Sequence, residues 1–190
     1  MENKQFIKLT SEVTVIDPCY QLNSRDRHLG RSLSDVLPGD WVCGVDYLYA
    51  RNRKKPTNVT NLYCYHEEYV GTNFDLDAMH YEGSCGVDSG QLGVFDNQYL
   101  GYIQNCEEKR LNNWYRSMCR TTLCKKLAGA KSDKCYVSSS GMGDGAYAVY
   151  TNRNSDGRIV AIRIQFIDLN STLSCFEDDS WLDDYEYPNI

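Results

Sequence analysis

The sequence contains no long apolar segment. Its longest apolar runs, such as residues 47–50, are far shorter than the roughly 20 residues that a membrane-spanning helix requires. Residues 1–8 also lack the basic region and apolar core of a secretory signal, because they turn polar again after Phe6 and Ile7. These absences argue against a membrane-bound or secreted protein and predict a soluble, cytoplasmic one.

Close cysteine pairs are absent as well, although the chain has nine cysteines. Structural zinc sites normally use a Cys-x-x-Cys pair, so zinc is the less favoured interpretation of the cluster Cys106, Cys119, Cys124 and Cys135. An odd number of cysteines cannot close into a complete set of intramolecular disulfides. We therefore expect reduced thiols, as in a cytoplasmic protein, and no metal or other cofactor.

Recognisable catalytic patterns are missing too. The three histidines, His28, His66 and His80, have no partner at a recognisable spacing, and Cys85 could act as a nucleophile only beside a base. The glycine-rich segment 138–147 lacks the Lys-Ser/Thr ending of a phosphate-binding P-loop. The sequence therefore favours a binding protein over an enzyme.

Tyrosine is abundant instead, with fifteen residues in a chain of 190. This length is sufficient for one domain with its own core, and a tyrosine-rich composition favours strands. Short β-like segments alternate with turn signals, and residues 158–166 place Ile162, Ile164 and Phe166 on one face. We predict an α+β fold: a β-rich single domain of mostly antiparallel strands at residues 1–176, followed by an acidic aromatic tail at residues 177–190.

One region has the periodicity of a helix. Apolar residues recur at spacings of three and four from Leu111 to Thr122, and Asn105 is suited to the N-cap. Basic side chains gather in the C-terminal half, where they complement the helix dipole. The sequence predicts one long amphipathic helix over about residues 105–127, and a short helical turn at residues 32–37.

The segment 138–147 places three glycines around Asp144. Glycine reaches positive φ without steric cost, so alternating glycines let successive N–H groups converge into a concave nest that binds anions. A tight turn in which Asp144 caps its own backbone explains the same residues. The sequence leaves both interpretations open.

Three acidic turns share this character. They are the Asp-Pro at residues 17–18, the Val-Asp-x-Gly at residues 87–90 and the Gly-Asp-Gly-x-Tyr at residues 143–147. In this order and spacing they resemble the motifs of a family of small, functionally uncharacterised proteins of bacteria and their phages. The resemblance implies a compact β-rich domain with an accessory role in a phage or a bacterium, and it supplies no catalytic residue.

If the three turns converge, they form a single ligand site. The glycine nest would bind an anion, and Tyr20 and Tyr147 could stack on a base, so the expected ligand is nucleotide-like. We expect a non-catalytic accessory protein, for example a phage counter-defence protein that sequesters a host signalling nucleotide. The predicted ligand-binding residues are Asp17, Tyr20, Asp88, Ser89, Gln91, Ser140, Gly141, Gly143, Asp144, Gly145 and Tyr147.

Two other functions fit the same sequence. Clustered carboxylates could hold Mg²⁺ or Ca²⁺ and assist phosphoryl hydrolysis. The tail could instead make the chain an inhibitor that binds a host protein through an acidic surface. The basic residues at 51–55 indicate a solvated hairpin tip rather than a nucleic-acid site, because the net charge is −6. The acidic residues of the tail are Glu177, Asp178, Asp179, Asp183, Asp184 and Glu186.

Overall fold

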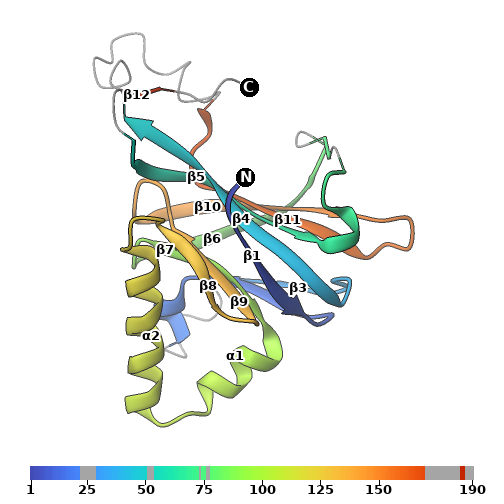
Figure 1. Cartoon of the computed structure of the whole chain (residues 1–190). Coiled ribbons are helices and arrows are strands. Elements are labelled where there is room, and N and C mark those ends of the chain that lie inside the picture. Colours follow the sequence, from blue (N-terminus) through green and yellow to red (C-terminus); the bar gives the residue numbers. More distant parts are fainter. Residues whose placement is uncertain (22–28, 51–53, 73, 76–77, 170–184, 187–190) are drawn as a thin grey trace.

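Three layers make up the described part of the chain: a large sheet, a small sheet and two helices (Figure 1). The computed structural model describes residues 1–21, 29–50, 54–72, 74–75, 78–169 and 185–186. Every pair of neighbouring strands is antiparallel. The β-rich α+β fold with mostly antiparallel strands is therefore confirmed.

The large sheet, sheet A, has the strand order β1-β4-β5-β11-β10-β6, and β12 also pairs with β4. Side chains alternate between the two faces of a strand, so Ile162 and Ile164 are fully buried while Arg163 between them is half-buried. This confirms the predicted alternation. The strands are β1 (Glu2–Leu9), β4 (Gly39–Ala50), β5 (Pro56–His66), β6 (His80–Val87), β10 (Gly145–Arg153), β11 (Ile159–Gln165) and β12 (Tyr185–Glu186).

The small sheet, sheet B, lies between sheet A and the helices (Figure 1). Consecutive residues of one strand serve two cores, because Val94 packs in the core shared with sheet A and Phe95 in the core under the helices. Sheet B has the order β3-β2-β7-β9-β8. Its strands are β2 (Val13–Ile16), β3 (Arg31–Leu33), β7 (Gln91–Asp96), β8 (Ala128–Ser132) and β9 (Cys135–Ser139).

Two helices, α1 (Asn97–Gln104) and α2 (Glu108–Thr122), replace the single helix predicted over about residues 105–127. α1 follows β7 directly because the carboxylate of Asp96 caps it, accepting from the backbone N–H groups of Gln98 and Tyr99. The prediction of one long helix is therefore not confirmed: α2 lies within the predicted range but is shorter, and α1 was missed together with its cap.

Asn105, the predicted N-cap, terminates α1 instead of starting α2. It is the C-cap of α1, and its Nδ2 donates to the carbonyl oxygen of Gly101 at 2.7 Å. Glu107 occupies the N-cap of α2, with no hydrogen bond from its side chain to the helix. Beyond Thr122 the chain leaves the helix in a turn, in which the backbone N–H of Leu127 donates to the carbonyl oxygen of Cys124.

The helical turn predicted at residues 32–37 is also wrong. Residues 31–33 form β3, which pairs with β2, and Val36 forms a bridge with Ile159. The backbone hydrogen bonds of this segment are made across strands, so tertiary pairing overrides the local helical pattern.

Cys43 and Cys64 form a disulfide, contrary to the expectation that the thiols are reduced. The register of β4 and β5 places them directly opposite each other, with their Cα atoms 4.1 Å apart, and both are fully buried. This contact depends on strand pairing, which the cysteine spacing does not reveal. The free cysteines of the described residues are Cys19, Cys85, Cys106, Cys119, Cys124 and Cys135.

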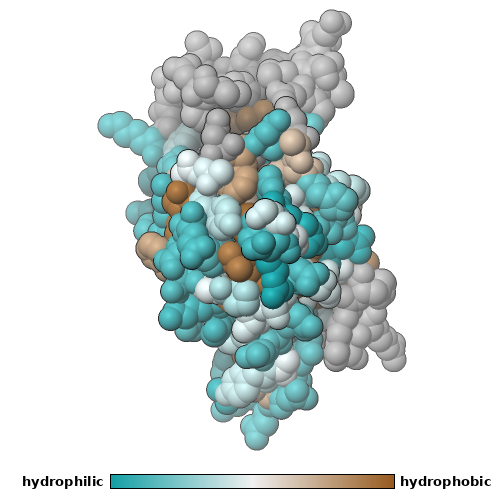
Figure 2. All heavy atoms as spheres, turned by 90° about the vertical axis from the view of Figure 1, so that its right-hand side faces the viewer, coloured by the Kyte–Doolittle hydropathy of each residue, from teal (hydrophilic) through white to brown (hydrophobic). Residues whose placement is uncertain are grey.

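The surface at the turn between β10 and β11 is largely hydrophilic, with small apolar patches scattered over it (Figure 2). Neither α1 nor α2, nor any other helix in the described ranges, is long and apolar enough to cross a membrane. The cytoplasmic location stays a prediction.

Candidate functional site

The three predicted turns lie together at one junction. Oδ2 of Asp17 accepts from the backbone N–H groups of Asp88 (2.9 Å) and Ser89 (2.8 Å), which joins the first turn to the second. The N–H of Ser140 donates to the carbonyl oxygen of Gly90 at 3.0 Å, which joins the second turn to the third. We call these three segments, residues 17–20, 88–91 and 140–147, the turn junction.

Asp17 has a structural role in this junction. Its carboxylate is fully buried, and its second oxygen accepts from the N–H of Cys19 (2.9 Å) and from Oγ of Ser89 (2.5 Å). Four donors of its own chain therefore surround the carboxylate, as burial of a charge requires. Burial raises the pKa of the Cys19 thiol, and the neighbouring Asp17 raises it further. The side chain of Asp17 thus anchors the short helix η1 (Pro18–Gln21) to the turn after β6.

Gln91 is turned away from the other predicted site residues. Its Nε2 donates to Sγ of Cys119 at 3.3 Å, and its Oε1 accepts from Oγ1 of Thr122 at 3.3 Å. Both partners belong to α2, and Gln91 is almost completely buried. The structure therefore gives Gln91 the role of joining sheet B to α2.

The glycine loop is held by side chains of its own segment. Oγ of Ser140 and the hydroxyl of Tyr147 both donate to the carbonyl oxygen of Gly143, at 2.7 and 2.8 Å. Gly141 and Gly143 have φ angles of 63° and 102°, in the region that glycine adopts readily. Ser140 and Tyr147 therefore hold the loop as a turn, while the backbone cap by Asp144 and the anion nest both stay predictions.

The electrostatic neighbours at the junction are acidic. The exposed Asp88 and Asp144 add to burial in raising the pKa of the hydroxyls of Tyr20 and Tyr147, respectively. An anion would be repelled by the same carboxylates. Moreover, Tyr20 is 4% exposed and Tyr147 is 8% exposed, so neither ring offers an open face to a base.

The described residues include no group of three or more histidine, cysteine, aspartate or glutamate side chains arranged to hold a metal. The acidic tail lies outside the described residues, apart from the backbone of Tyr185 and Glu186 in β12. The metal-dependent phosphohydrolase alternative therefore has no group of metal ligands to support it among the described residues.

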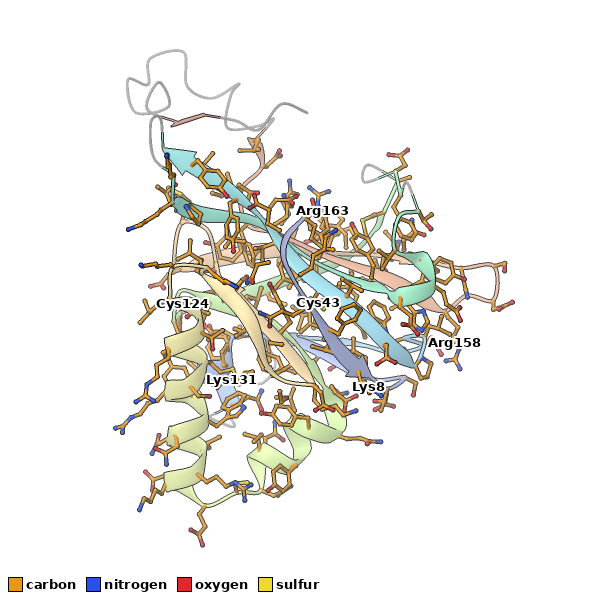
Figure 3. The ribbon with its side chains drawn as sticks, viewed as in Figure 1. Lys8, Cys43, Cys124, Lys131, Arg158 and Arg163 are labelled. Atoms are coloured by element: carbon orange, nitrogen blue, oxygen red, sulfur yellow. A yellow bond between two sulfur atoms is a disulfide. The ribbon has the colours of Figure 1, made fainter. Side chains whose placement is uncertain are left out.

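The outer face of sheet A carries a second, more open arrangement. Four side chains form one row across four neighbouring strands, because the ladder places Tyr150 opposite both Tyr81 and Arg163, and Arg163 opposite Tyr63. We call Tyr81, Tyr150, Arg163 and Tyr63 the tyrosine row. Figure 3 shows Arg163 above the central strands, on the side of sheet A away from the helices.

Arg163 is the cation of the tyrosine row. Its guanidinium lies 5.6 Å from the ring centre of Tyr150, and its Nε donates to Oδ1 of Asn61 at 3.0 Å. No ion pair of Arg163 occurs within the described ranges. The nearby carboxylate of Asp46 instead pairs with the N-terminal amine at 2.8 Å. The guanidinium is therefore positioned by a neutral amide and a ring, with the carboxylate of Asp46 nearby, and it keeps donors for an anion.

The aromatic members differ in exposure. Tyr81 is 53% exposed, and its ring lies 5.6 Å from that of the half-buried Tyr150. Tyr63 is 5% exposed and stacks on Tyr65 at 5.8 Å, and burial raises the pKa of Tyr65 to about 12. Tyr81 and Tyr150 thus supply the open end of the row.

A cavity of about 420 Å³ lies beside β6 and β10, and neither Tyr81 nor Tyr150 is among its lining residues. Glu82 lies at an irregularity of the β6–β10 ladder between the pairs formed by Gly83 and Tyr81, and its Oε1 accepts from Oγ1 of Thr151 at 2.7 Å. Arg153 lies 3.9 Å from the same oxygen. Such bulges commonly redirect a side chain at a functional site. The cavity is lined by Ala78, His80, Glu82, Thr151, Asn152 and Arg153.

Sequence reasoning missed the tyrosine row. Tyr81, Tyr150 and Arg163 lie far apart in the sequence and meet only through strand pairing. The one available signal was the alternation in β11, which placed Arg163 on the polar face of a strand.

The fold and these contacts define a two-sheet α+β protein with an open aromatic face. Residues 71–164 match the family described as "Protein of unknown function (DUF4241)", so this part of the chain is similar to an uncharacterised family. The matched part contains Tyr81, Tyr150 and Arg163, together with the second and third turns of the junction. Searches of curated proteins and of solved structures found no match.

Proposed function

We propose that the protein binds a small anionic ligand of the nucleotide type on the outer face of sheet A. The observation that carries the proposal is the position of Arg163, next to Tyr150 and without an ion pair in the described ranges. A base would stack on Tyr81 and Tyr150, and the guanidinium would pair with a phosphate. The ligand class is the one expected from the sequence, at a different site.

The turn junction supports this site from a distance. Gly145 lies opposite Val87 on the same ladder that pairs Tyr150 with Tyr81, so the junction fixes the relative position of β6 and β10. The direct ligand role predicted for the junction residues stays a separate proposal, which the acidic neighbours and the buried rings do not favour.

The proposal is limited to binding. His80 and Glu82 line a cavity beside β6 and β10, but a catalytic role requires a nucleophile, an acid and a base with defined geometry toward a substrate. A non-catalytic accessory protein that sequesters a nucleotide, in a phage or a bacterium, agrees with this proposal and with the resemblance of the three turn motifs.

Calorimetric titration of the full chain with linear and cyclic mononucleotides and cyclic dinucleotides tests the proposal. Arg163→Gln should weaken binding by about 10-fold or more, because a charge-assisted hydrogen bond contributes about 1.5–3 kcal/mol. Arg158→Gln is the matched control, since Arg158 lies at the end of the β10–β11 turn and is 3.7 Å from Asp35. No heat from any nucleotide, or equal weakening by both variants, would falsify the proposal.

A further inference from the structure

A second cavity, of about 270 Å³, lies between α1 and the adjacent strands of sheet B. It is separate from the tyrosine row, because its lining comes from η1, β2, β3 and α1 and none of it from sheet A. Its volume is close to the roughly 300 Å³ at which ligand pockets begin, which leaves room for one small ring. The polar side chains of its lining are Thr14, Gln21, Ser32, Asn97 and Gln104.

The hydrogen bonds within this lining leave donors and an acceptor for a ligand. Oγ1 of Thr14 donates to Oδ1 of Asn97 at 2.7 Å, and Nε2 of Gln104 donates to Oε1 of Gln21. Within the described residues, the amide NH₂ groups of Asn97 and Gln21 are left as donors, and Oε1 of Gln104 is left as an acceptor.

The lining is selective for uncharged molecules. All five polar side chains are hydroxyls or amides, each with donor and acceptor capacity, and none of the described residues that line the cavity is charged or aromatic. Ile16 and Leu100 supply an aliphatic surface beside them. Hydroxyl groups on a ring with apolar C–H faces match this combination, whereas a nucleobase is usually held by stacking on an aromatic ring or an arginine.

Gly101 supplies an independent observation. It stands inside α1, where glycine is less favourable than alanine, yet a Cβ atom added there would have no neighbour within 4 Å. Packing therefore does not require glycine at this position. Because Gly101 also lines the cavity, a longer side chain would take up space that a ligand needs.

We propose that this cavity binds a small neutral polyol, of the size of one monosaccharide. The site is independent of the nucleotide proposal, because the two sites share no residue. It would give the protein a second ligand, with a chemistry unlike that of the anion expected at Arg163.

Saturation-transfer NMR of the full chain with glucose, galactose, mannose, ribose and myo-inositol tests this site. At least one of these probes should receive saturation, and Gly101→Leu should abolish the transfer while the thermal transition of the variant shows that it is folded. Gln104→Leu, which removes the free acceptor without filling the cavity, should reduce the transfer at least about 5-fold. Gln98→Leu, at an exposed position of the same helix, is the control and should leave it unchanged.

Three results would overturn the proposal: no transfer to any probe, transfer that survives Gly101→Leu and Gln104→Leu, or transfer to adenine or uracil in place of the polyols. Arg163→Gln separates the two proposed sites. It should leave polyol binding intact even if nucleotide binding is lost or never existed, so each proposal can fail alone.

Discussion

The turn junction and the tyrosine row differ in how their polar groups are used. In the junction, Asp17 receives four hydrogen bonds from its own chain, and the carbonyl oxygen of Gly143 receives two. In the tyrosine row, Arg163 has an amide oxygen and a ring as neighbours, and Tyr81 is 53% exposed. The turn junction has the more distinctive sequence motif, yet its polar groups are hydrogen-bonded within the chain. The tyrosine row has the less distinctive sequence but is open to a ligand.

The largest loss of stability is expected from substitution of Asp17 in the turn junction. Asp17→Ala should lower the free energy of unfolding by about 3–5 kcal/mol, because each buried donor left without a partner costs about 1–3 kcal/mol. Asp144→Ala is the control at an exposed carboxylate and should change it by less than about 0.5 kcal/mol. Urea unfolding measures both. Equal losses in the two variants would remove the distinction between a structural and an exposed aspartate.

Gly141 and Gly143 should differ, although both have positive φ. A Cβ at Gly141 would lie 2.9 Å from Cβ of Phe166 and 3.0 Å from the carbonyl oxygen of Val59, whereas a Cβ at Gly143 would have no neighbour within 4 Å. Gly141→Ala should therefore cost about 2–4 kcal/mol, from backbone strain and overpacking together. Gly143→Ala should cost about 1–2 kcal/mol, from strain alone. If urea unfolding finds Gly143→Ala the more damaging, the loop is held differently from the contacts described.

Two tyrosines separate binding from stability. Tyr81→Ala should weaken nucleotide binding by about 5-fold or more, since stacking on one aromatic ring contributes about 1–3 kcal/mol. Its unfolding free energy should change little, because the side chain is mostly exposed. Tyr147→Phe should do the reverse, losing the hydrogen bond to Gly143 and about 1 kcal/mol of stability without a change in affinity. Calorimetry and urea unfolding of both variants test this. A loss of stability in Tyr81→Ala, or a loss of affinity in Tyr147→Phe, would contradict the prediction.

Local patterns predicted part of the fold and only the outline of the site. The alternation in β11 and the turn motifs are local, so the sequence revealed the strand, the antiparallel class and three turns that do meet. The start of α1 depends on Asp96, whose carboxylate serves as the helix cap. Propensity alone does not locate such a helix start.

Contacts between distant segments could not be predicted. The tyrosine row joins residue 81 to residues 150, 163 and 63 through three strand pairings, and a register shift by one residue would move each side chain to the other face. The opposition of Cys43 and Cys64 depends on the register of β4 and β5 in the same way. The three turns, whose motifs are continuous in the chain, were therefore predicted, whereas the tyrosine row, which strand pairing assembles, was missed.

The smallest effect on stability is expected from alkaline pH, through Tyr65, which stacks on Tyr63 of the tyrosine row. Burial, and then the carboxylate of Asp46, raises the pKa of Tyr65 to about 12, while Arg163 lowers it. A pKa raised in the folded state above the usual value of about 10 means that the folded protein holds the proton more tightly. The resulting stability is complete below about pH 10 and is lost as the pH rises through 12.

Thermal unfolding at intervals across this pH window measures the loss. Tyr65→Phe should show a shallower decline than the unaltered protein, because it removes one titrating hydroxyl, and Tyr102→Phe at an exposed position of α1 serves as the control. Arg163→Gln should move the decline attributable to Tyr65 to higher pH, since it removes the charge that favours the phenolate. If Arg163→Gln leaves the alkaline profile unchanged, the guanidinium does not lie against the tyrosines, and the contrast between an open row and a closed junction loses its electrostatic basis.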